Sequence, residues 1–124
     1  MKQEDKNLLL KDLCARLPYG VKMNHIADNE HSPVDLVGIN EDYIILKGGG
    51  YSYVPVEHYK PYLFPMLNKT KQQSKEWKSL MIQDFYGILY PTIESYDYLN
   101  KYHFDYRGLI EKGLAIDATN LNIY

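Results

Sequence analysis

YIILKGGGYSYVPVEHY, residues 43–59, decides the fold, because its three consecutive glycines separate two runs rich in aromatic and branched apolar residues. A phosphate-binding loop needs its glycines between a strand and the N-terminus of a helix, whose backbone N–H groups face the anion. After Gly50 the chain continues Tyr-Ser-Tyr-Val-Pro-Val, which is typical of a strand, and Pro55 excludes a helix there. Gly48–Gly50 are therefore predicted to form the turn of a β-hairpin, where glycine supplies the positive φ that a reversal needs.

Other short runs of Val, Ile and Tyr precede this hairpin, and turn-forming segments separate them. YGVKMNHI alternates, with Val21 and Met23 on one face, and VDLVGIN follows after the polar segment ADNEHSP. With YIIL and YSYV they predict a four-stranded antiparallel meander, either an open sheet or an SH3-like barrel. Pro55 is expected at an edge or a bulge, because proline lacks the N–H of a ladder bond. The segment KPYLFPM is predicted to leave the sheet as an extended connection.

A helix is predicted before the strands, from about Glu4 to Arg16, because the position before Pro18 resists helical geometry. Side chains at helical spacing indicate its buried face: Leu10, Leu13, Cys14 and Leu17. The single cysteine is therefore expected to be a buried core thiol, and it excludes an internal disulfide.

A second helix is predicted after the strands. Thr70 and Gln73 form a capping box, and the helix is expected to continue to about Leu89. Its apolar face is predicted to contain Trp77, Leu80, Met81, Phe85 and Ile88.

A third helix and a folded-back tail complete the predicted chain. Thr92 can cap a helix from Ile93 to about Tyr102. The segment HFDYRGLIEKGLAI that follows contains five large apolar side chains, each of which costs about 1.5–3 kcal/mol when it is left in water. The segment is therefore expected to fold back on the sheet or on the second helix. The prediction is an α+β protein with a single domain, residues 1–124.

Composition and charge exclude several classes of protein. The chain has 124 residues and a net charge of −2, which provides no overall field for attracting nucleic acid. Acidic residues stand near the N-terminus where a signal peptide needs basic ones, and no apolar run is long enough to span a membrane. We therefore expect a cytoplasmic protein that makes no contact with membranes.

Metal and catalytic motifs are incomplete. The densest set of metal-capable residues is His25, Asp28, Glu30, His31 and Asp35. Its spacing matches no metal motif, and it occupies a segment that is predicted to be a hairpin loop. Ser32 and Ser52 lack the context of a nucleophile elbow. The sequence therefore predicts no metal, no cofactor and no enzyme activity.

Two groups of residues are candidates for binding. The first is His103, Asp105, Tyr106 and Arg107, which form either a small polar site or a structural turn. The second is the set Tyr51, Tyr53 and Tyr59, which either offer a stacking platform for bases or pack the sheet against a helix. Packing is favoured, because little positive charge stands nearby in the sequence. A small enzyme that uses His103, Asp105 and Arg107, with His25 or His31 brought near by folding, is an alternative. It predicts that these side chains converge in one pocket.

A further alternative is nucleic-acid binding through a basic helix face. Four lysines stand close together against a single glutamate, Glu76, and they are Lys69, Lys71, Lys75 and Lys78. Such a face is more often simply solvated, so nucleic-acid binding is disfavoured.

The tyrosine content favours an interaction protein. The chain has 13 Tyr but only 3 Phe and 1 Trp, and tyrosine suits half-buried contact surfaces because its large ring carries a polar hydroxyl. The leading prediction is a small non-enzymatic module that binds a protein partner or associates with itself.

Three segments carry a resemblance to known sequences. DLCARLPYGVK, KPYLFPM and YLNKYHFDYRGLIEKGLAID resemble an uncharacterised family of small proteins from Bacteroides-type gut bacteria and their phages or mobile elements. The resemblance implies an accessory protein of phage or mobile-element origin, and it carries no fold, ligand or activity.

Overall fold

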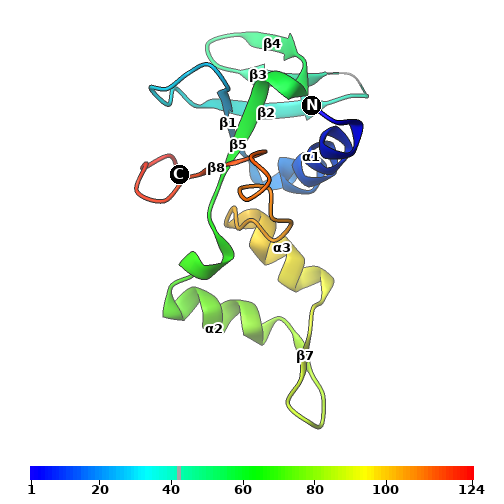
Figure 1. The fold of residues 1–124 in the computed structure, drawn as a ribbon. Helices are drawn as coiled ribbons and strands as arrows, with labels where there is room; N and C mark the ends of the chain where they lie inside the picture. The colour runs from blue at the N-terminus through cyan, green and yellow to red at the C-terminus, as the bar shows by residue number, and fades with distance from the viewer. Residues whose placement is uncertain (42) are drawn as a thin grey trace.

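The computed structural model describes residues 1–41 and 43–124 (Figure 1). The main sheet has the strand order β4-β3-β2-β1-β5-β8, and β6 and β7 form a separate two-stranded hairpin. The strands are β1 Lys22–His25, β2 Val34–Ile39, β3 Ile44–Lys47, β4 Tyr51–Val54, β5 Tyr59–Leu63, β6 Ile82–Gln83, β7 Leu89–Tyr90 and β8 Ile116–Asp117. The helices are α1 Gln3–Arg16, α2 Lys71–Ser79 and α3 Ile93–Lys101, with single 3₁₀ turns η1 Leu17–Tyr19, η2 Val56–His58 and η3 Met66–Asn68. The predicted α+β class with an N-terminal helix and a mostly antiparallel sheet is confirmed.

The triple glycine is the turn of the β3–β4 hairpin, as predicted. Lys47 pairs with Tyr51 across it, and the Gly48 N–H donates to the carbonyl of Gly50. Gly49 has φ 101°, a conformation that L side chains rarely adopt. β1, β2, β3 and β4 form the predicted antiparallel meander.

KPYLFPM does not leave the sheet, and that prediction is wrong. β5 pairs with β1 in the register Met23–Pro61, Asn24–Lys60 and His25–Tyr59. On its other side β5 pairs in parallel with β8, which begins only opposite Tyr62. Pro61 is therefore tolerated in a strand inside the sheet, because no ladder bond is required of it on the β8 side. The β8 pairing also confirms that the C-terminal segment folds back on the sheet.

The buried face of α1 differs from the predicted one. It consists of Leu9, Asp12, Leu13 and Arg16, while Cys14 is exposed. Asp12 and Arg16 are completely buried and paired with each other, so an ion pair occupies positions that an apolar pattern assigns to solvent. The two leucines join the main core with inward-facing residues of the sheet and the tail, which include Met23, Ile44, Leu46, Leu63, Leu109 and Leu114.

α2 is shorter than predicted and ends at Ser79, after the predicted capping box of Thr70 and Gln73. The chain then forms the β6–β7 hairpin, because Asp84 accepts hydrogen bonds from the backbone N–H groups of Tyr86 and Ile88 at 2.9 Å each. Such bonding to the local backbone favours a turn over a helix. Figure 1 shows this hairpin projecting from the end of the molecule furthest from β4.

α3 begins and ends close to the predicted residues. Thr92 and Ser95 form its capping box, and Lys101 is its last residue. α2 and α3 contact each other, and the β6–β7 hairpin connects them (Figure 1). In the described part of the chain, no helix combines the length and the apolar character needed to cross a membrane.

Candidate functional site

The residues predicted to form a polar site lie together in the chain, but their side chains have separate surroundings. Asp105 accepts hydrogen bonds from the backbone N–H groups of Leu109 at 2.8 Å and Ile110 at 2.9 Å, so it holds the turn that follows it. Arg107 was expected to bond to the backbone of the same turn, and that prediction is wrong, because its side chain donates to Asp12 of α1. His103 lines a surface hollow. The three side chains therefore do not converge in one pocket, and the enzyme alternative loses its predicted arrangement.

Arg107 belongs to a buried ionic network. Its Nη1 lies 3.0 Å from Asp12 Oδ1 and 2.9 Å from the hydroxyl of Tyr106. Arg16 donates to Asp12 through Nε at 2.7 Å and through Nη2 at 3.1 Å, and Nη2 also donates to the carbonyl of Phe104 at 2.8 Å. The network connects α1 to the segment after α3, so it has a structural role.

His103 occupies a backbone position that normally belongs to glycine. It follows the C-terminus of α3 with φ 66°, and the next N–H, of Phe104, donates to the carbonyl of Leu99 at 2.8 Å. This is the bonding of a helix end that closes through a left-handed residue. The imidazole stacks on the ring of Tyr124, with centroids 3.6 Å apart and an interplanar angle of 12°. Its Nδ1 is buried and has no hydrogen-bond partner among the described residues.

Tyr124 is held from both sides. Its hydroxyl donates to the carbonyl of Tyr62 at 2.8 Å and accepts from the N–H of Lys22 at 3.0 Å. The burial of this hydroxyl raises the pKa of Tyr124. The last residue of the sequence is thereby attached to β5 and β1, and it supports the imidazole of His103.

Burial, with smaller contributions from Arg16 and Lys22, lowers the pKa of His103 from 6.5 to about 4. Between these two values the unfolded chain binds a proton that the folded chain does not, so stability falls as the pH falls from 6.5 to about 4. Below that range both states are protonated and no further loss arises from this group. We expect the loss to be about 1–2 kcal/mol, after allowance for solvent screening of a half-buried ring.

Urea unfolding at a series of pH values checks this expectation. The control is His103→Asn, because asparagine also tolerates positive φ and does not titrate. The variant should lose less stability than the wild type between pH 6.5 and 4. Parallel curves for the two proteins would mean that His103 does not resist protonation in the fold.

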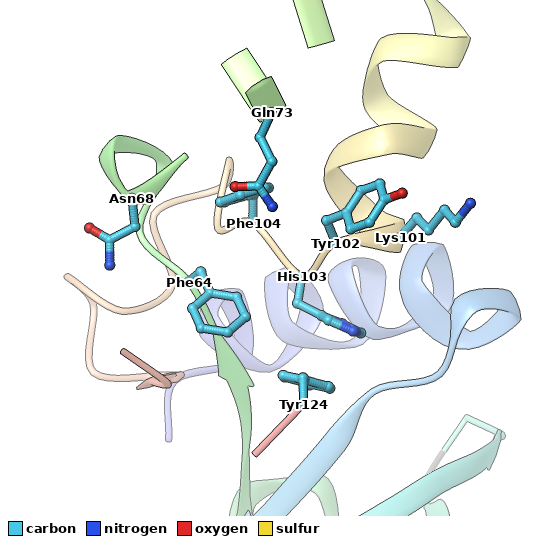
Figure 2. Close-up of a pocket in the computed structure, with 8 residues that line it drawn as sticks. All are labelled: Phe64, Asn68, Gln73, Lys101, Tyr102, His103, Phe104 and Tyr124. Carbon is cyan, nitrogen blue, oxygen red and sulfur yellow. The ribbon is translucent and has the colours of Figure 1, made fainter. Parts of the chain in front are cut away.

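The hollow beside His103 has a volume of about 340 Å³. Figure 2 shows its lining side chains, which come from the end of β5, η3, the first turn of α2, the end of α3 and the C-terminus. They are Phe64, Asn68, Gln73, Lys101, Tyr102, His103, Phe104 and Tyr124. His103 and Tyr124 also line a second hollow of about 230 Å³, whose other residues include Lys22 and Asp35. The stacked pair is therefore a wall shared by two hollows.

Tyr51 and Tyr53 lie elsewhere. Both are on β4, at the opposite edge of the sheet from β8, and they are 66% and 67% exposed. The alternative that they pack the sheet against a helix is therefore wrong. Lys47 Nζ lies 5.7 Å from the ring centroid of Tyr51, so the two tyrosines form a solvated surface with a cation beside it.

The basic face of α2 is smaller than predicted. Lys69 precedes the helix, and its Nζ donates to the carbonyl of Met66 at 2.8 Å and lies 4.5 Å from the Trp77 centroid and 4.6 Å from that of Phe104. Burial lowers the pKa of Lys69. The remaining exposed lysines are Lys71, Lys75 and Lys78. Nucleic-acid binding through this helix face stays a prediction. Three of the four lysines that it requires are exposed.

The metal-capable residues between β1 and β2 include Asp28, which forms hydrogen bonds within its own loop. Asp28 accepts hydrogen bonds from the N–H groups of Glu30 and Ser32, which lower its pKa. His31 Nδ1 lies 2.9 Å from the hydroxyl of Tyr62. Among the described residues no three His, Cys, Asp or Glu side chains are grouped as metal ligands.

A run of exposed apolar side chains at the β6–β7 hairpin was not predicted from the sequence. Phe85 is 96% exposed and Tyr86 84%, and they contact each other edge to face at the tip of the β6–β7 hairpin. Exposed apolar side chains continue along the hairpin to the start of α3, and they are Ile82, Ile88, Leu89, Tyr90 and Ile93. We refer to residues 82–93 as the aromatic arm.

The chain matches no known protein family, no curated protein and no solved structure.

Proposed function

We propose that the protein is a small non-enzymatic interaction module that uses the aromatic arm to bind a protein partner. The observation that carries this proposal is the exposure of Phe85 and Tyr86 at the tip of an ordered hairpin. Contiguous apolar surface that projects into solvent is unfavourable for a free protein and is typical of contact sites. Aromatic side chains provide much of the binding energy of protein interfaces.

Hydrogen bonds to Asp84 stabilise the turn of the aromatic arm. The two oxygens of Asp84 accept three hydrogen bonds, from the N–H groups of Tyr86 and Ile88 and from the hydroxyl of Tyr90. Gly87, with φ 81°, allows the reversal. The aromatic tip is therefore presented in one conformation, which lowers the entropic cost of binding.

We further propose that the sheet is an SH3-like barrel and not a flat open sheet. The consecutive antiparallel order β4-β3-β2-β1-β5 supports this, as does the 3₁₀ turn η2 between β4 and β5. β2 contains an irregularity between Leu36 and Gly38, and a bulge of this kind bends a strand. An accessory role in a phage or mobile element remains part of the proposal.

The double variant Phe85→Ser/Tyr86→Ser tests the arm. We expect it to keep the wild-type melting temperature, because neither side chain is packed in the fold, and to weaken association by about 10–100-fold. Association is measured in two ways: light scattering over a concentration series detects self-association, and affinity capture from host lysate, followed by titration of the purified partner, detects a different protein.

The matched control is Tyr51→Ser/Tyr53→Ser, which removes two similarly exposed aromatic rings from β4. A wild-type chain that stays monomeric and retains no partner would contradict the proposal. Equal loss of binding in both double variants would contradict the assignment to the arm.

A further inference from the structure

His103 lines a hollow and stands in the left-handed backbone position that ends α3. A non-glycine residue with φ 66° is strained. The chain places glycine at five left-handed positions, for example Gly87 and Gly113, and other residues at four, of which His103 is the one that ends a helix. Unlike glycine, His103 adds a ring at this position, and that ring stacks on Tyr124.

One face of the His103 ring stacks on Tyr124. The ring nitrogen Nδ1 is buried and has no hydrogen-bond partner among the described residues. A buried polar atom in this state costs stability, because water satisfies it in the unfolded chain. A neutral imidazole can either donate or accept at this nitrogen. The ring that carries this buried nitrogen forms part of the wall of the hollow.

The hollow that His103 lines has mainly aromatic walls and one cationic side chain. Its rings belong to Phe64, Tyr102, Phe104 and Tyr124, and they come from three separate parts of the chain. Of the eight lining side chains none is acidic, and one, Lys101, is cationic. The ammonium group of Lys69 lies 4.6 Å from the centroid of the Phe104 ring. The volume of about 340 Å³ is that of a small-molecule site.

We propose that this hollow binds a small flat aromatic molecule that carries an anionic group. The ring of the ligand packs against the aromatic walls, as bases stack on aromatic side chains. The anionic group pairs with Lys101, and the imidazole of His103 forms part of the stacking wall. The amide side chains of Asn68 and Gln73 offer further polar contacts at the wall.

Two sources of this chemistry are distinguished by titration calorimetry. AMP and UMP represent mononucleotides, and indole-3-acetate and 4-hydroxyphenylacetate represent aromatic carboxylates. We expect at least one of the four to bind with a Kd below about 1 mM, and its neutral parent, adenosine, uridine, indole or 4-methylphenol, to bind at least 10-fold more weakly. Inorganic phosphate and acetate are expected not to bind measurably.

The variants locate the site. His103→Gly keeps a residue suited to positive φ and should weaken binding at least 10-fold, and Lys101→Gln, at an exposed position, should weaken it about 3–10-fold. Lys78→Gln, an exposed lysine of α2, is the matched control and should bind normally. The aromatic-arm variant should also bind normally, so the failure of one proposal leaves the other unaffected.

Three results would overturn the inference. They are the absence of binding by all four compounds at 1 mM, binding of phosphate or acetate as tight as that of the aromatic anions, and unchanged affinity in both site variants.

Discussion

Asp12→Asn is expected to lower the free energy of unfolding by about 3–5 kcal/mol, the largest loss expected for any polar substitution in this chain. The reason is that Asp12 is the shared anion of two guanidinium groups, those of Arg16 and Arg107. The side chains of Asp12 and Arg16 are 0% exposed. Removing the anion leaves the charge of Arg16 buried and uncompensated, and its Nη1 already lacks a hydrogen-bond partner among the described residues. Urea unfolding at pH 7 measures the loss.

Companion variants separate charge from position. Glu4→Gln, an exposed acid on the same helix, should change stability by less than about 0.5 kcal/mol. Arg107→Ala should cost about 1–3 kcal/mol, because its side chain is partly exposed and its removal still leaves Asp12 paired with Arg16. Replacing the inner pair together, Asp12→Leu/Arg16→Met, should recover part of the loss of Asp12→Asn, since Arg107 can turn towards water. A loss below about 1 kcal/mol for Asp12→Asn would contradict the network.

The burial of this ionic network was not predicted from the sequence. Pro18 predicts where α1 ends. Helical spacing assigns its buried face to Leu10, Leu13, Cys14 and Leu17, because hydrophobicity is the criterion. The buried ion pair does not follow this criterion. The charged side chains of Asp12 and Arg16 are buried, and the apolar Cys14 is exposed. The i, i+4 spacing of an acid and an arginine was the available signal. It is the same signal that an ordinary surface pair gives, so burial could not be deduced from it.

Local signals predict local structure well in this chain. The triple-glycine turn, the capping box of Thr70 and Gln73, the Thr92 cap and the extent of α3 depend on neighbours within a few residues, and each was predicted. The error at α2 came from apolar spacing over 77–88, which fits a helix, whereas Asp84 selects a turn by bonding to its own backbone. The place of β5 beside β1 depends on a partner some 35 residues away in sequence, which no local pattern contains.

The candidate sites also combine features that the local sequence predicts with features that depend on residues far apart in the chain. His103, Tyr51 and Tyr53 could be selected from residue type, but the hollow beside His103 requires side chains from five segments. Two of its lining rings, Phe64 and Tyr124, are about 60 residues apart in sequence and meet because Tyr124 bonds to Tyr62. The aromatic arm was not predicted, because the second helix was expected to continue to about Leu89 with Phe85 on its buried face.

Asp105→Ala is expected to lower the free energy of unfolding by about 2–4 kcal/mol, the second of the large effects. Its carboxylate accepts hydrogen bonds from the N–H groups of Leu109 and Ile110, and its own N–H donates to the carbonyl of Phe64. Alanine keeps the last bond and removes the first two, so Leu109, which is completely buried, is left with an unpaired N–H.

The same substitution at Asp117 is the matched control. Asp117 also accepts from a backbone N–H, that of Thr119, but it is exposed, so water replaces the lost bond and the cost should stay below about 1 kcal/mol. Beyond the difference in stability, amide hydrogen exchange should show lost protection in Asp105→Ala first at Leu109 and Ile110. The parallel β5–β8 pairing lies downstream of this turn, so protection at Ile116 should fall with it. If the two alanine variants were equally stable, the turn would be held by the apolar contacts of Leu109 and Leu114, and the carboxylate of Asp105 would be free to serve a ligand.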